Sequence, residues 1–243
     1  GEGAAIGNSP ETTSANNQAN LFNGGIESLH AQLTLTQSTI TGNSASNSSA
    51  VSIGGVAVFG GIATITGSTI VDNSGIGLHA AGTTTLTSTI VAANGTDISG
   101  ILSGTHNLIG DPDDAGPFTH GMDNNIVGQD DGMGGRELLD ITTAVRTTLV
   151  EAGGFAPVLP LVEGSPAIDQ GDPNNPPQHD QRGDPYTRSV GTAPDIGAFE
   201  SQQQSTDGYN VDTGSDVFDL HLGNQDGQTS LREAVALANA RPG

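Results

Sequence analysis

The sequence predicts an all-β solenoid of stacked coils, because one phrase recurs along the chain and the text around it alternates as strands do. Ser-Thr-Ile followed by Asn occurs three times, at residues 38–43, 68–73 and 88–94. Residues 33–36 and 63–66 alternate apolar residues with threonine, which fits strands with one buried face. Copies spaced by 30 and then 20 residues, with Gly, Ser and Asn between them, are typical of coils joined by turns of variable length. A sandwich of antiparallel strands is the alternative, but it has no need to repeat the same words.

Equivalent residues of the three copies are expected to stack from coil to coil. An apolar row in the interior would consist of Ile40, Ile70 and Ile90. An amide row at a corner would consist of Asn43, Asn73 and Asn94. Asn suits a corner because it tolerates left-handed backbone angles and its amide hydrogen-bonds to the copy above.

The composition agrees with a narrow, stacked interior. The chain of 243 residues has 36 Gly, no Cys, no Trp and only 3% aromatic residues. A globular core built on large rings is therefore disfavoured, whereas stacked Ile, Val, Leu and Ala suffice for a solenoid. The absence of Cys excludes stabilisation by disulfides.

The charge balance excludes two classes of partner. The chain carries 27 acidic and 6 basic residues, for a formal net charge of -21. Such a surface repels nucleic acid and anionic membrane, and no apolar run approaches the roughly 20 residues that span a bilayer. Salt water or bound divalent cations would relieve the self-repulsion. The text begins inside a solenoid without a secretion signal, so we expect the natural start to lie elsewhere.

Four segments follow from these patterns. Residues 1–110 are expected to form β-helix coils, residues 111–200 the final coils and a closing region, residues 201–206 a linker, and residues 207–243 a separate segment with a helix. Within the second segment, residues 138–149 fit either a last coil or a short helix.

The last segment contains the clearest helix signal. Ser230 and Glu233 form a capping box, in which each side chain accepts the backbone N–H of the other. Leu231 and Val235 share one face, and residues 242–243, Pro-Gly, end the helix. A helix this short needs a partner surface, so we expect a C-terminal capping helix.

These phrases resemble a group of secreted bacterial proteins. The repeats resemble the right-handed parallel β-helix of the pectate-lyase-like superfamily. Residues 164–172, 180–183 and 195–200 resemble the closing region of large β-helix surface proteins, worded GSPAIDxG, DxRG and DIGAFE. Residues 229–234 are similar to the CSLREA domain, with Thr229 where the family has Cys. The resemblance implies an extracellular or cell-surface location. It is specific for architecture and says little about activity.

The order of these parts is permuted relative to that family. There the CSLREA-like helix precedes the coils and the closing region, whereas here it follows both. We therefore expect residues 207–243 to cap or prime the first coils of another copy, either the next repeat of a giant polypeptide or the next subunit of a filament. Such head-to-tail contacts do not close, and they generate a fibre. An arbitrary boundary of the sequence is the alternative.

An enzyme is not expected. Residues 1–110 contain no Lys or Arg, and their few acids are scattered rather than paired as a lyase or hydrolase requires. Arg182 with Asp180 and Asp184 is a basic-acidic group, and a structural ion pair is the better interpretation. The six His residues never lie within four residues of each other, which argues against zinc.

Calcium is the one candidate cofactor. An acidic cluster precedes the helix and consists of Asp212, Asp216, Asp219 and Asp226. Another spans the closing region and consists of Asp169, Asp172, Asp180 and Asp195. Asp226 with Glu233 also matches part of an EF-hand loop, but Leu222 occupies the first ligand position.

The first hypothesis is therefore a structural subunit or repeat of an extracellular filament, sheath or stalk whose partners are copies of itself. The second is an adhesin or carbohydrate-binding module, in which coil faces rich in Thr, Ser and Asn contact glycans. A polysaccharide lyase or hydrolase comes third.

Overall fold

The fold was obtained as a computed structural model, and it is an all-β parallel solenoid of about 5 turns. The structure describes residues 9–10, 12–19, 23–45, 52–154 and 156–202. The described residues up to Ser201 belong to one compact unit. The all-β parallel solenoid predicted from the repeats is thus confirmed, while the C-terminal capping helix lies outside the described residues.

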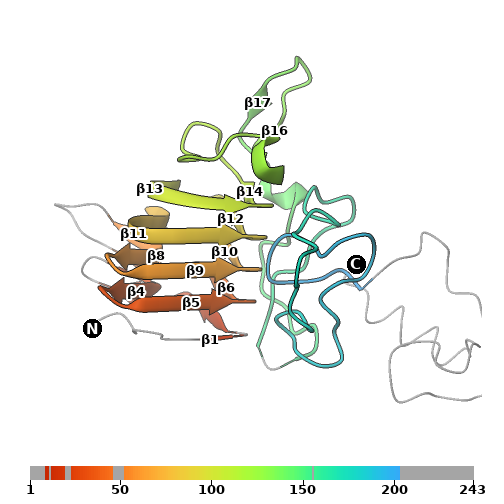
Figure 1. Cartoon of the computed structure of the whole chain (residues 1–243), viewed down its shortest axis with the longest axis horizontal. Coiled ribbons are helices and arrows are strands. Elements are labelled where there is room, and N and C mark those ends of the chain that lie inside the picture. The colour runs from red at the N-terminus through yellow and green to blue at the C-terminus, as the bar shows by residue number, and fades with distance from the viewer. Residues whose placement is uncertain (1–8, 11, 20–22, 46–51, 155, 203–243) are drawn as a thin grey trace, which may run out of the picture. The chain divides into compact units, whose positions relative to one another are not determined.

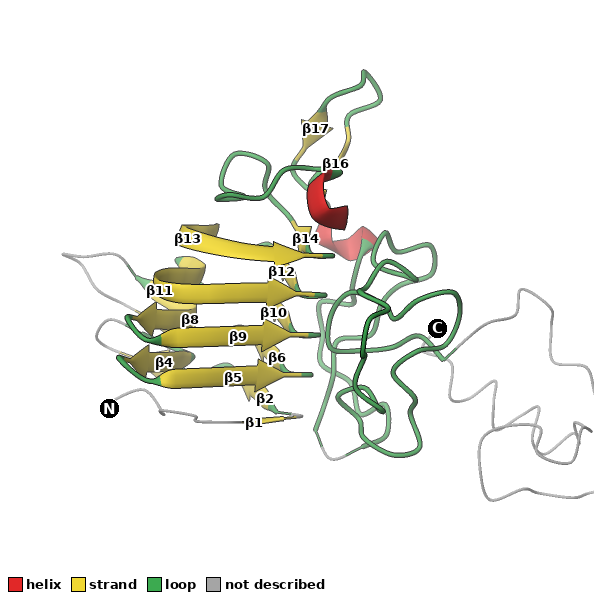
Figure 2. Cartoon of the chain, viewed as in Figure 1, coloured by secondary structure: helices red, strands yellow, loops and turns green. Residues whose placement is uncertain are grey.

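Two parallel sheets line the solenoid (Figures 1 and 2). The first contains β1 (Ser9–Pro10), β4 (Ile26–Leu29), β5 (Gln32–Thr36), β8 (Ile53–Phe59), β9 (Ile62–Thr66), β11 (Ile76–Thr87) and β13 (Thr96–Thr105). The second contains β2 (Thr13–Ala15), β6 (Thr39–Thr41), β10 (Thr69–Val71), β12 (Ile90–Ala92), β14 (Leu108–Ile109) and β15 (Ile126–Val127). Short pairs are formed by β3 (Gln18–Ala19) with β7 (Ser44–Ala45), and by β16 (Gln129–Asp130) with the antiparallel β17 (Arg136–Glu137).

The long strand β11 joins the two halves of the first sheet. Its beginning pairs with β8, and its end pairs with β9. Glycines allow the coils to approach closely near β8, because a Cβ at Gly55 would lie 2.0 Å from the carbonyl oxygen of Gly77. This approach explains part of the high glycine content.

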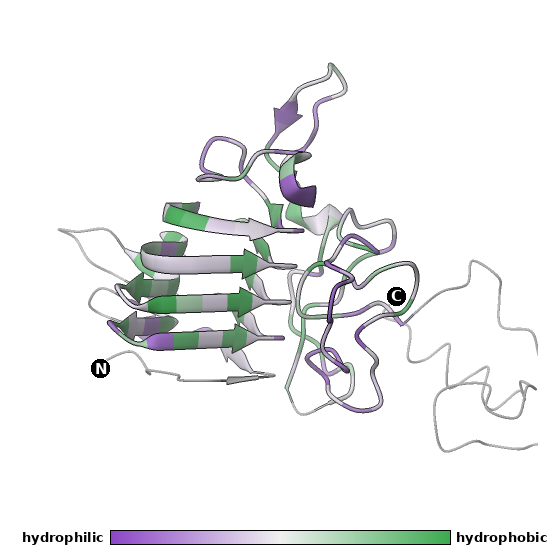
Figure 3. Ribbon diagram, in the orientation of Figure 1, coloured by the Kyte–Doolittle hydropathy of each residue, from purple (hydrophilic) through white to green (hydrophobic). Residues whose placement is uncertain are grey.

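The interior of the solenoid is filled by every second residue of its strands. Along β5 and β9 the residues facing inward are buried, as at Leu33, Leu35, Ala63 and Ile65, and the threonines between them face outward. Figure 3 shows hydrophobic positions recurring at matching places in successive strands. Beyond the last coil, Ala115 and Phe118 of the following loop join the same core cluster and cover its end.

The expected interior row of Ile40, Ile70 and Ile90 is wrong at Ile90. Ile40 pairs with Ile70, and both belong to the interior cluster. Ile70 pairs with Val91, however, and Ile90 instead joins a second cluster outside the coil. The cause is a one-residue offset: the third phrase lies one residue further from its Asn than the other two, and Asn94 stays in register with Asn73.

A closing segment, residues 157–201, covers the outer face of the second sheet. Ile90 and Leu108 on that face pack with Val158, Ile196 and other residues of the second cluster. Residues 138–149, whose spacing fits either a coil or a short helix, form neither: they contain the 3-10 turn η2 (Ile141–Thr143) and a bridge between Val145 and Leu161. A further 3-10 turn, η1, spans Met122–Asn124.

The closing segment touches coil after coil. Thr13 Oγ1 donates to the carbonyl of Pro157 at 2.7 Å, and Thr39 Oγ1 contacts Gln181 Oε1 at 2.5 Å. The backbone N–H of Ala198 donates to Thr69 Oγ1 at 3.0 Å. In the next coil, Ser88 accepts backbone N–H bonds at its carbonyl and its hydroxyl, from Gly197 and Asp172, both at 2.8 Å.

Candidate functional site

An amide ladder runs along one corner of the solenoid. The Oδ1 atom of Asn73 accepts from both the backbone N and Nδ2 of Asn43, at 3.1 and 3.0 Å. In the same way Asn94 Oδ1 accepts from the backbone N and Nδ2 of Asn73, both at 3.0 Å. Asn43 Oδ1 accepts from the same two groups of Asn17. The three expected asparagines therefore lie in one row, to which the structure adds Asn17 at one end.

A carboxylate ends this ladder. Asp97 Oδ1 accepts from the backbone N and Nδ2 of Asn94, both at 3.1 Å, and Oδ2 accepts the N–H of Asp111 at 2.9 Å. Burial raises the pKa of Asp97 to about 6, although the hydrogen bonds from Asn94 and Asp111 oppose the shift. A lone Asp among scattered acids gives no sequence signal for this role.

A second polar ladder follows the start of the strands in the second sheet. Each backbone N–H donates to a side-chain oxygen one coil further on, from 3.3 Å at Ser38 to 3.0 Å at Asn107. Its acceptors are Ser38, Ser68, Thr89, Asn107 and Asn125. The repeated phrase contains its first members, but sequence reasoning did not identify the row, because the residue type changes from Ser to Thr to Asn.

The last long strand leaves one edge without a strand neighbour. Among the strands described, β13 pairs only with β11. On its other side, Ile98 and His106 donate backbone N–H groups to the carbonyls of Asp114 and Asp123, near the two ends of the strand. Between these contacts Ile101 is 85% exposed. An exposed strand edge is a template for pairing with another chain.

A buried ion pair organises the closing segment. Arg182 Nη2 lies 2.6 Å from Asp180 Oδ2, and both side chains are buried. The guanidinium is sandwiched between the rings of Tyr186 and Phe199, 4.0 Å from each centroid. Arg182 Nη2 also donates to the carbonyl of Glu200 at 2.7 Å. The pair is inaccessible to a substrate, so its geometry supports the structural interpretation given to these residues from the sequence.

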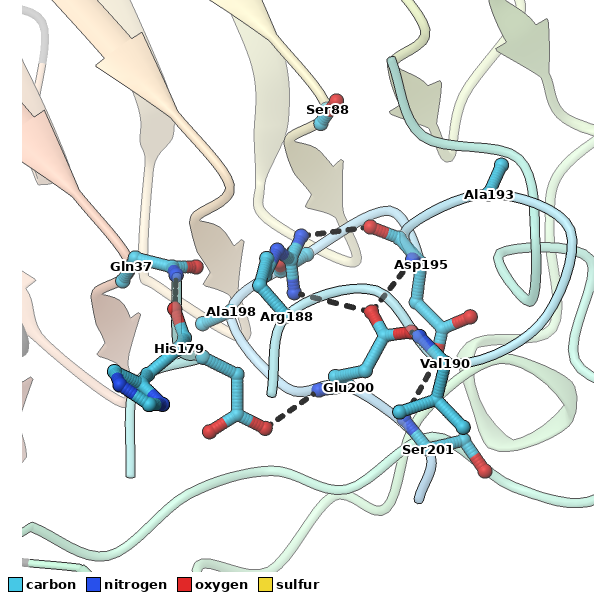
Figure 4. A network of polar contacts seen from close by, with 12 residues as sticks. Gln37, Ser88, His179, Arg188, Val190, Ala193, Asp195, Ala198, Glu200 and Ser201 are labelled. Carbon is cyan, nitrogen blue, oxygen red and sulfur yellow. Dashed lines mark hydrogen bonds and ion pairs between the residues drawn. The ribbon is translucent and has the colours of Figure 1, made fainter. Parts of the chain in front are cut away.

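A neighbouring network surrounds Glu200 (Figure 4). Its carboxylate accepts the backbone N–H groups of Val190 and Asp195, both at 2.8 Å, and Arg188 Nη1 lies 3.7 Å from Oε2. Burial, followed by the nearby Asp195, raises the pKa of Glu200 to about 8. Burial also raises the pKa of Asp195 to about 6. Both carboxylates are buried and accept backbone N–H groups, which is typical of a network that holds loops together.

The four acidic residues expected as a cluster in the closing region accept backbone N–H groups. Asp195 accepts backbone N–H groups from Asp169 and Ser201, and Asp180 accepts those of Arg182 and Glu200. Asp169 accepts from Thr192, and Asp172 from Asn174. Across the described part of the chain, no group of three or more His, Asp or Glu side chains is arranged to hold a metal ion.

The remaining site predictions fall outside the described residues. They are the tentative calcium ligands Asp212, Asp216, Asp219 and Asp226 and the capping residues Ser230, Leu231, Glu233 and Val235.

Comparison with known families, with curated proteins and with solved structures gave no match for this chain. Among the helices described, none has the length and apolarity needed to cross a membrane.

Proposed function

We propose that the chain is a structural building block of an extracellular filament, sheath or surface stalk, which assembles head to tail through the ends of its solenoid. The resemblance of the closing wording to bacterial β-helix surface proteins, and the charge of -21, support the extracellular location. Calcium as a counter-ion remains part of the proposal for the acidic segment before residue 230.

The observation that carries the proposal is the pair of unlike strand edges at the two ends. At one end, β1, β2 and β4 are the outermost described strands of their sheets. At the other, β13 has no described strand beyond it. Because every coil pairs in parallel with the next, the outer edge of a last coil is complementary to that of a first coil. Contact between unlike ends does not close on itself and gives a fibre.

The loop that covers the β13 end of the solenoid limits which groups of two copies could come into contact. Ala115 and Phe118 already shield the interior beyond the last coil. The joint would therefore use backbone edge groups of β13 rather than bare apolar core. Side-chain ladders parallel to the stack provide positions at which a neighbouring copy continues the same hydrogen bonds.

Electron microscopy of the purified 243-residue chain over a concentration series tests the proposal. We expect filaments that lengthen with concentration. Ile101→Asp adds a charge to the free edge and should abolish them. Ile62→Asp, on the central strand β9 with a side chain that is 57% exposed, is the matched control and should leave them intact. Dispersed particles at every concentration, or equal effects of the two variants, would overturn the proposal.

A further inference from the structure

The outer face of the first sheet carries a grid of hydroxyl groups. Thr34, Thr64, Thr85 and Ser103 are paired from strand to strand in one column, in that order. Thr36, Thr66, Thr87 and Thr105 form a second column two residues further along the same strands. Figure 2 shows these strands, β5, β9, β11 and β13, lying side by side and nearly parallel.

The spacing of the grid follows from strand geometry. Neighbouring strands lie about 4.8 Å apart, and residues two apart on one strand are separated by about 6.6 Å. Threonine side chains are β-branched and stiff about χ1, so the hydroxyl and methyl groups are held in fixed rows. The grid is therefore ordered before any ligand arrives.

These hydroxyls face solvent and are not used by the fold. Thr64, Thr85 and Ser103 are exposed, whereas Thr34 and the whole second column are half-buried. None of the eight side chains hydrogen-bonds to a residue that the structure describes.

The face is also uncharged on a strongly acidic chain. The residues next to the first column on the same face are Gln32, Ile62, Thr83 and Ile101, and none of them is charged. These positions thus carry no charged side chain, although the chain as a whole has a net charge of -21. This arrangement suits an uncharged, periodic partner, and the lack of an aromatic side chain on these strand faces disfavours stacking on sugar rings.

We propose that this threonine grid binds the surface of ice. The oxygen rows on the prism face of hexagonal ice repeat in two perpendicular directions at distances similar to those of the grid. Each hydroxyl and methyl contact is weak, but a rigid array makes many of them together at little cost in conformational entropy. The proposal does not depend on head-to-tail assembly, since the grid lies within one copy.

Partition of the purified, fluorescently labelled chain into a slowly growing ice shell tests this assignment, at concentrations below any filament formation. We expect the chain to enter the ice, whereas Thr64→Tyr, which places a bulky ring in the centre of the grid, should be excluded like a non-binding protein. Thr147→Tyr, at an exposed position outside the solenoid strands, is the matched control and should enter as the parent does. Circular dichroism and melting curves verify that each variant is folded.

Four results would overturn the proposal. The parent chain is excluded from ice, or Thr64→Tyr enters ice as well as the parent does. Alternatively, without ice uptake, Thr64→Tyr abolishes adsorption to insoluble cellulose or chitin, which would assign the face to glycans. Loss of a concentration-dependent dimer in light scattering, again without ice uptake, would assign the face to a second copy of this chain.

Discussion

Truncation of a central rung should show how much the amide ladder stabilises the solenoid. Asn73→Ala deprives the buried backbone N–H of Asn43 of its acceptor. It also removes the bonds that Nδ2 donates to the carbonyls of Ile40 and Val71 and to Asn94 Oδ1, at 3.0 to 3.1 Å. An orphaned buried N–H costs about 1–3 kcal/mol and each lost bond about 1 kcal/mol net, while the desolvation cost of the amide itself disappears, so we expect a loss of about 3 kcal/mol.

Urea unfolding, followed by circular dichroism, measures this free energy. Asn17→Ala is the matched control, because Asn17 is exposed, stands at the end of the ladder and donates to Asn43 without accepting from a described rung. Its truncation should cost less than about 1 kcal/mol. Equal losses for the two variants would refute the idea that the interior rungs stabilise the stack by satisfying buried backbone groups.

Three further outcomes are expected. Glu200 has a pKa raised to about 8, so the folded state holds a proton that the unfolded state releases above its ordinary value of 4.5; stability should therefore fall as pH rises from about 4.5 to 8. Glu200→Gln should flatten that slope in urea titrations, and exposed Glu137→Gln should not. Arg182→Ala strands a buried carboxylate and should cost about 3–5 kcal/mol by the same assay. Ile90→Ala should speed hydrogen exchange in the closing segment first, whereas Val91→Ala should speed it in the coils; the reverse order would contradict the register.

The repeats were sufficient to predict the solenoid and its corner asparagines, because both follow from period and residue type. Aligning the words Ser-Thr-Ile misplaces Ile90, because the distance from isoleucine to asparagine is one residue longer in the third copy. The hydrogen bonds across the stack select the asparagine register, and the apolar row then accepts Val91, which is nearly the same shape.

The sequence contains no indication of the course of the closing segment. Its residues carry no period of two or 3.6, so nothing local indicates which surface they cover. The charges of Asp169 and Asp195 suggested a cation, yet in the fold these carboxylates hold backbone N–H groups of neighbouring loops. The presence of acidic residues in a segment does not distinguish cation ligands from acceptors of backbone N–H groups.

The closing segment contacts successive coils, so its length matches a fixed number of them. Its partners are Thr13, Thr39, Thr69 and Ser88. In most repeat proteins a unit can be added or deleted because each touches only its neighbours. Here an inserted coil would shift later contact points by one strand spacing, about 4.8 Å, while the segment keeps its length. The segment therefore fixes the number of coils that it can cover, and it opposes growth of the solenoid one coil at a time.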